Sequence, residues 1–161
     1  MDYLWTPWRY QYITTAGEYE GCVFCGAAQS QPSAESLVVL RARLNYVILN
    51  RFPYTNGHLM VVPYAHAASL LELPDETLQE AILLVRDAER ILREVYLPDG
   101  LNMGINFGKS AGAGVAGHVH IHAMPRWAGD TSFITAIGET RVLPEDLAVT
   151  WDRLHKAFAG T

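Results

Sequence analysis

The sequence predicts an α+β domain in which an antiparallel sheet of about five strands carries one long helix and a C-terminal helix. The chain has 161 residues, about the length of one domain, and half of them are hydrophobic, which excludes a disordered or fibrous chain. The expected elements follow one another as strands, helix, strands and helix. Because strand and helix do not alternate regularly, this order favours an antiparallel sheet over a doubly wound one. We expect a single domain over residues 1–161, with an N-terminal arm at 1–20 and a core at 21–161.

The first three strands are expected to form an antiparallel meander. Residues 37–40 and 46–50 are short runs rich in β-branched and large apolar side chains, with a turn between them. Asn56-Gly57 is a strong turn signal because these residues adopt positive φ at low cost. Residues 58–62 then form the third strand, which ends at Pro63.

Two helices and two further strands complete the predicted fold. Apolar residues recur near helical spacing over residues 75–97, with Asp75 as the expected N-cap. Alternation predicts strands over 101–107 and 118–123. A final helix is expected over 144–158, with an apolar face that needs a covering surface.

Charge and composition exclude several classes of protein. Twelve basic and 17 acidic residues give a net charge of −5, so a groove for a nucleic acid polymer is not expected. The longest apolar stretches fall well short of the roughly 20 residues that a membrane span needs. The N-terminus has neither the basic region nor the apolar core of a signal peptide. Two cysteines do not make a disulfide framework, and we expect a reducing, cytoplasmic setting.

His118, His120 and His122 alternate with apolar residues in the segment that Pro125 is expected to end. On a strand, three such imidazoles project from one face, about 7 Å apart. Metal ligation and nucleophilic catalysis both suit this row. Open metal sites usually recruit a carboxylate, and none lies near the row before Asp130, which favours nucleophilic catalysis.

A glycine-rich loop precedes the histidine row. Residues 108–117 contain four glycines and offer backbone N–H groups, the Ser110 hydroxyl and the Lys109 ammonium group, which together suit a phosphate. The spacing of its glycines is not that of a Walker A motif. A long flexible hairpin is the alternative interpretation of this loop.

Cys22 and Cys25 form a CxxC motif. Taken alone, the motif is consistent with a redox pair, a zinc half-site or chance. No thioredoxin-like βαβ pattern surrounds it, which disfavours the redox pair, and a zinc site would need two more ligands. His155 lies outside every motif, and we expect it at the surface.

The sequence resembles the histidine triad (HIT) family of nucleotide hydrolases and transferases over nearly its whole length. The resemblance rests on His118-Val119-His120-Ile121-His122-Ala123-Met124-Pro125 and on Asn56-Gly57-His58-Leu59-Met60-Val61-Val62-Pro63 followed by His66. Two further segments resemble the bacterial branch that includes diadenosine tetraphosphate phosphorylases. They are Leu4-Trp5-Thr6-Pro7-Trp8-Arg9 near the N-terminus and Pro125-Arg126-Trp127 directly after the histidine motif.

The resemblance implies a set of catalytic and binding residues. His120 would be the nucleophile that attacks the α-phosphorus and forms a nucleotidyl-imidazole intermediate. His122 and His58 would contact phosphate oxygens or hold the nucleophile in place. His118 would lie behind the nucleophile. The implied nucleotide- and phosphate-binding residues are Asn50, which would bind the ribose, and Asn106, Gly108, Ser110, Gly112 and Gly114. Many members have Gly-Gln-Ser-Val before the triad; this chain has Ala113-Gly114-Val115-Ala116, and the phosphorylase branch also lacks that Gln.

The resemblance also implies a structural zinc held by Cys22, Cys25, His66 and His118, and a homodimer. The implied substrate is a dinucleoside polyphosphate such as diadenosine tetraphosphate, with water or phosphate as the open choice of acceptor. Two alternatives remain at this point: a zinc-dependent hydrolase that uses the histidine row as open ligands, and a non-catalytic nucleotide-binding module.

Overall fold

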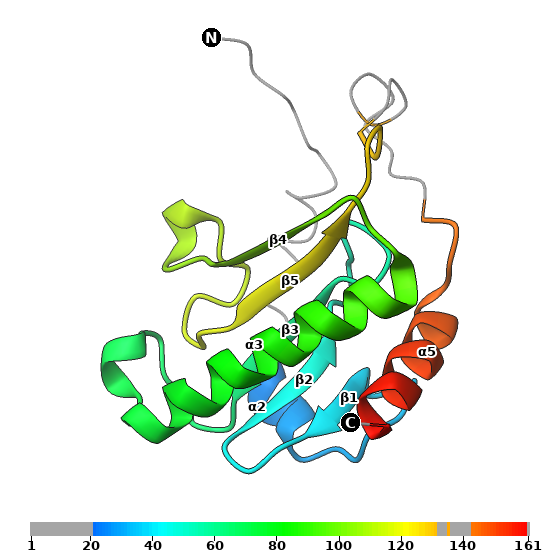
Figure 1. Ribbon diagram of the computed structural model, residues 1–161. Coiled ribbons are helices and arrows are strands. Elements are labelled where there is room, and N and C mark those ends of the chain that lie inside the picture. Colours follow the sequence, from blue (N-terminus) through cyan, green and yellow to red (C-terminus); the bar gives the residue numbers. More distant parts are fainter. Residues whose placement is uncertain (1–20, 132–134, 136–142, 161) are drawn as a thin grey trace, which may run out of the picture.

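A computed structural model describes residues 21–131, 135 and 143–160 (Figure 1). The expected N-terminal arm at 1–20 lies outside these residues. The described chain forms a five-stranded sheet in the order β1-β2-β3-β5-β4, and every neighbouring pair is antiparallel. The strands are β1 (Val38–Arg41), β2 (Asn45–Leu49), β3 (Leu59–Pro63), β4 (Gly100–Ile105) and β5 (Ile121–Arg126). The predicted α+β class and antiparallel sheet are confirmed.

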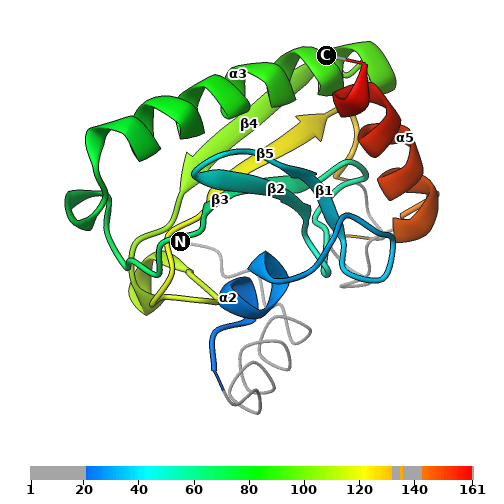
Figure 2. The same cartoon turned by 90° about the horizontal axis from the view of Figure 1, so that it is seen from below.

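The two faces of the sheet are covered differently. The long helix α3 (Asp75–Tyr96) packs on one face against β5, β3 and β2, and α5 (Leu147–Ala159) packs beside it against β1. The short helix α2 (Val23–Ala28) lies on the opposite face (Figure 2). Two short 3-10 helices, Leu70–Glu72 and Lys109–Ala111, lie in the loops. No helix among the described residues has the length and apolarity to cross a membrane.

The strand that contains His122 begins and ends later than predicted. β5 starts at Ile121, after His118 and His120, and it continues through Pro125 to Arg126. Proline is tolerated there because the pairing of β5 with β3 ends at Ala123, so the missing N–H leaves no ladder bond broken on that side. The Pro125 carbonyl is also satisfied, since the Thr55 hydroxyl donates to it at 3.0 Å.

The first edge of the sheet is closed by α5. The indole N–H of Trp151 donates to the Val38 carbonyl at 2.7 Å, and His155 Nδ1 donates to the Val39 carbonyl at 2.7 Å. The expectation that His155 is a surface residue is therefore wrong: it is half-buried and satisfies an edge carbonyl of β1. The apolar face of α5 is covered by the chain itself, because Leu154 and Phe158 belong to the core.

The helix ends differ slightly from the prediction. The N-cap of α3 is Pro74, with extended backbone angles, and Asp75 is the first helical residue. Asp75 therefore acts through its charge in the first turn, where an acidic side chain is favourable. α5 begins at Leu147 because the Asp146 carboxylate caps it by accepting from Val149 N–H at 2.9 Å. Helix α2 was not predicted.

Candidate functional site

Two cysteines and two histidines from three segments lie close together on the α2 side of the sheet. The ligand atoms of Cys22, Cys25, His66 and His118 all lie within 4.8 Å of one another. Cys22 Sγ is 3.3 Å and Cys25 Sγ is 3.6 Å from His118 Nδ1, and Cys25 Sγ is 3.3 Å from His66 Nδ1. A tetrahedral zinc with bonds of about 2.3 Å to sulfur and about 2.0–2.1 Å to nitrogen separates S and N ligands by about 3.6 Å. The donor set and its spacing therefore fit zinc.

Local structure positions each member of this cluster. Cys22 is the N-cap of α2 and Cys25 lies within its first turn, so the two thiols face one corner. His118 is fully buried, and its Nε2–H donates to the Pro63 carbonyl at 2.9 Å. This bond fixes the tautomer and leaves the unprotonated Nδ1 directed at the thiols, as a metal-binding histidine requires.

His120 has the opposite tautomer. Its Nδ1 lies 2.8 Å from the backbone carbonyl of His118 and must carry the hydrogen, since a carbonyl can only accept. Nε2 therefore keeps its lone pair. The His120 ring packs at 4.8 Å from the ring of Phe24, which is the neighbour of Cys25 in α2. Burial lowers the pKa of His120, although the bond to the His118 carbonyl opposes this. A buried, neutral imidazole with a free lone pair is a competent nucleophile.

His58 and His122 form a directed pair beside His120. The backbone N–H of Tyr54 donates to His58 Nδ1 at 3.2 Å, so the hydrogen of His58 lies on Nε2. His58 Nε2 donates in turn to His122 Nδ1 at 2.9 Å, which leaves an N–H on His122 Nε2. Burial lowers the pKa of His122 to about 4, with a smaller contribution from His120. The His120 and His122 rings are 4.8 Å apart, so this donor lies next to the nucleophile.

The other predicted site residues lie around this row. Asn50 Nδ2 is 3.4 Å from His58 Nε2, and its Oδ1 accepts from Phe52 N–H at 3.0 Å. The glycine-rich loop contains the 3-10 helix Lys109–Ala111, whose turn is closed by the Gly112 N–H bond to the Lys109 carbonyl at 3.0 Å. Ser110 is exposed on this loop, and Asn106 is half-buried where the loop begins.

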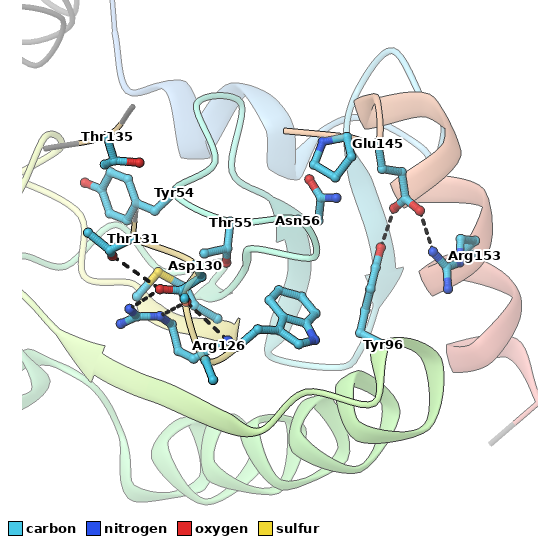
Figure 3. A pocket seen from close by; sticks show the side chains of 15 residues that line it. Tyr54, Thr55, Asn56, Tyr96, Arg126, Asp130, Thr131, Thr135, Glu145 and Arg153 are labelled. Atoms are coloured by element: carbon cyan, nitrogen blue, oxygen red, sulfur yellow. Dashed lines mark hydrogen bonds and ion pairs between the residues drawn. The ribbon is translucent and has the colours of Figure 1, made fainter. Parts of the chain in front are cut away.

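Sequence reasoning missed three features of the site. Phe24 and Tyr54 contact the histidines, but an isolated aromatic residue carries no signal of such a contact. A cavity of about 540 Å³ lies beyond the end of the histidine row. It is lined by the loop 54–56, the end of α3, Met124, residues 126–131, Thr135 and residues around the start of α5 (Figure 3). These segments are distant in the sequence, so no single motif announces the cavity.

Comparison with known proteins agrees with this geometry. The HIT domain model matches residues 31–129. A Mycobacterium tuberculosis protein named AP-4-A phosphorylase is 41% identical over 158 residues, which is 93% of this chain and 80% of that protein. The crystal structure of a Zn-bound histidine triad family protein from Mycobacterium smegmatis has a TM-score of 0.69 at 32% identity and covers 87% of this chain and 94% of its own. Protein hit of Bacillus subtilis is 33% identical over 146 residues, 88% of this chain and 97% of its own. The chain belongs to the histidine triad (HIT) family.

Proposed function

We propose that this chain cleaves dinucleoside polyphosphates of the diadenosine tetraphosphate type through a nucleotidyl intermediate on His120. The observation that carries the proposal is the tautomer of His120, whose Nδ1–H is held by the His118 carbonyl so that Nε2 has a free lone pair. The name of the 41% identical relative, AP-4-A phosphorylase, supports this class of substrate.

The reaction proceeds in two displacements. The Nε2 lone pair of His120 attacks the α-phosphorus, the N–P bond forms, and the bond from phosphorus to the bridging oxygen breaks with its electron pair on the departing polyphosphate. An oxygen of water or inorganic phosphate then attacks the same phosphorus and the N–P bond breaks. The electron pair returns to Nε2, and the proton of the acceptor passes to solvent.

Neighbouring donors would stabilise the charge that develops on the phosphoryl oxygens. The N–H on His122 Nε2 is supported by His58 through the 2.9 Å bond between the two rings. Asn50 would hold the ribose, and the remaining donors are assigned to Asn106, Gly108, Ser110 and Gly114. Because the Gly112 N–H closes the 3-10 turn, Gly112 contributes its left-handed backbone, with φ of 93°.

The metal site has a structural role in this proposal. Bound zinc would connect α2 to the segment just before β5. All four tetrahedral positions would be occupied, by Cys22, Cys25, His66 and His118. Among the described residues only His118 of the histidine row belongs to this ligand group. This arrangement favours a closed site over the alternative in which the row supplies open ligands to a catalytic zinc.

The proposal includes a single domain, a homodimer and a cytoplasmic setting. The one continuous sheet with its covering helices supports a single domain over the described residues. Ile82 and Leu83 on α3 and Met103 on the edge strand β4 are large apolar side chains that the described chain leaves 62%, 48% and 37% exposed. These side chains support association of two copies.

Product analysis tests the proposed function. Diadenosine tetraphosphate is incubated with the protein, with and without inorganic phosphate. ADP plus ATP formed only when phosphate is present indicates phosphorolysis, whereas AMP plus ATP without phosphate indicates hydrolysis. Binding without any product would contradict the proposal and favour a non-catalytic nucleotide-binding module.

A further inference from the structure

The ring of Phe24 connects the candidate zinc ligands to the proposed nucleophile. Its centroid lies 5.5 Å from the centroid of the His118 ring and 4.8 Å from that of the His120 ring. Phe24 and His120 are 6% and 5% exposed, and His118 is fully buried. His118 belongs to the metal group, and its carbonyl accepts from His120 Nδ1. One side chain of α2 therefore contacts both a metal ligand and the group that would attack phosphorus.

The backbone around Phe24 is held on both sides of the residue. Phe24 lies between Cys22, the N-cap of α2, and Cys25 in the first turn, and both cysteines are candidate ligands of the same zinc. The Tyr46 hydroxyl donates to the Phe24 carbonyl at 2.8 Å, and the Tyr46 side chain is itself fully buried. A six-residue helix has little stability of its own, so these contacts decide where α2 lies. They make the Phe24 ring a fixed surface for its neighbours.

The hydrogen bond of His120 does not fix its imidazole by itself. The torsion χ2 of histidine is broad, so a ring held only at Nδ1 can still tilt. Nucleophilic attack needs Nε2 in line with the phosphorus, and small misplacements slow such a step strongly. The rings of Phe24 and His122, each with its centroid 4.8 Å from that of His120, restrict the tilt. His122 also offers a hydrogen-bond donor, whereas the contribution of Phe24 is packing.

We infer that Phe24 is a positioning residue for the proposed nucleophile: its ring holds the His120 imidazole so that Nδ1 donates to the His118 carbonyl and Nε2 is presented for attack. The inference rests on the proposed function. Phe24 acts through the orientation and the tautomer of His120 and not on the substrate. The CxxC segment thereby has a second role, because the two cysteines that bind zinc also hold the residue between them against His120.

The first part of the test measures the tautomer of His120 in the zinc-containing protein. The histidines are labelled with ¹⁵N and observed by NMR at about pH 8, where an imidazole is neutral. The His120 signals are identified by their loss in His120→Ala. The wild type should carry the hydrogen on Nδ1 alone. Phe24→Ala opens space beside the ring, so the imidazole can turn away from the His118 carbonyl, and the hydrogen should be distributed over both nitrogens.

The second part measures turnover, binding and zinc content on the same proteins. In Phe24→Ala, kcat for cleavage of diadenosine tetraphosphate should fall about tenfold or more, because the nucleophile is misaligned. The dissociation constant of AMP and the zinc content should stay as in the wild type. Phe158→Ala is the matched control, since Phe158 is 5% exposed in the same core but lies on α5. It should lose stability and keep both the single tautomer and kcat.

The possible outcomes separate this inference from the proposed function. A wild type that does not cleave diadenosine tetraphosphate would overturn the proposed function, and the tautomer comparison, which needs no substrate, would still decide whether Phe24 holds His120. A Phe24→Ala protein that keeps the single Nδ1–H tautomer or the wild-type kcat would overturn the inference alone. Equal losses of kcat in Phe24→Ala and Phe158→Ala would also overturn it. If Phe24→Ala loses zinc or fails to fold, Phe24→Leu against Phe158→Leu decides, and a wild-type tautomer and kcat in Phe24→Leu would overturn the inference.

Discussion

Backbone groups fix the tautomers of His118, His120 and His58, and His58 in turn fixes that of His122. His118 donates from Nε2 to the Pro63 carbonyl, His120 donates from Nδ1 to the His118 carbonyl, and His58 accepts at Nδ1 from the Tyr54 N–H. The segment that leads into β5 thereby presents a metal-binding nitrogen from His118 and a free lone pair from His120. The sequence predicts the row, because its period is visible, but the tautomers depend on partners up to 55 residues away.

The low pKa of His122 makes stability depend on pH. Its pKa is about 4 in the folded chain, because of burial and the neighbouring His120, against about 6.5 in the unfolded chain. Between these values the unfolded state binds more protons, so the contribution to stability is complete above about pH 6.5 and is lost as the pH falls toward 4. We expect the urea midpoint to decrease from pH 7 to pH 5, and to decrease less steeply in His122→Asn. Equal slopes in both proteins would contradict this role.

Gly57, next to His58, is expected to tolerate no side chain. Its φ is 75°, and an added Cβ would lie 2.8 Å from Cε2 of Tyr96. Gly57→Ala should lower the free energy of unfolding by at least about 1–2 kcal/mol, because the left-handed conformation alone costs that much for a residue with Cβ. Gly104→Ala is the matched control, since its Cβ would meet nothing within 4 Å and its φ is not positive. Urea unfolding of both variants measures the difference, and equal stability would refute the clash.

At the scale of elements, long patterns were predicted better than short ones. The five strands and both long helices were predicted to within about three residues, because alternation and helical spacing extend over several residues. Helix α2 has six residues, too few for a helical period to show, and its tertiary contacts hold it in place. The Tyr46 hydroxyl, for example, donates to the Phe24 carbonyl at 2.8 Å.

Helix α2 should depend on zinc. Protein purified without chelator should contain about one zinc per chain. Cys25→Ala should contain almost none, because a structural zinc site needs all four of its ligands to hold the metal. Cys25→Ala and chelator-treated protein should both unfold at lower temperature than the zinc-loaded protein. Val23→Ala, on the same helix with its side chain partly exposed, is the control and should keep its zinc. Wild-type protein without zinc would refute the assignment.

At the scale of the whole molecule, the sheet brings together segments that the sequence keeps apart. The cavity is lined by residues between 54 and 153. The four candidate zinc ligands lie between residues 22 and 118. The four zinc ligands were predicted because the family resemblance identifies them. The cavity was not predicted, because its residues are ordinary turn and helix-end residues. The apolar face of the last helix, which was expected to need a covering surface, is covered by β1 and α3 of the same chain.

Association of two copies is a prediction at this scale. Ile82, Leu83 and Met103 leave apolar surface on α3 and on β4, the edge strand of the described sheet, and an edge strand is a natural site of pairing. Sedimentation equilibrium at micromolar concentration should give twice the chain mass of 17.9 kDa. A monomer under these conditions would contradict the prediction.

The turnover of His120→Ala tests the central claim, that Nε2 of this residue attacks phosphorus. Diadenosine tetraphosphate cleavage is measured for the wild type, His120→Ala and the control His155→Ala, whose histidine lies on α5 away from the row. We expect His120→Ala to lose nearly all turnover while still binding AMP, and His155→Ala to retain turnover with a small loss of stability. A His120→Ala protein that keeps about a tenth of the wild-type rate, a deficit worth only about 1.4 kcal/mol, would mean that the nucleophile lies elsewhere.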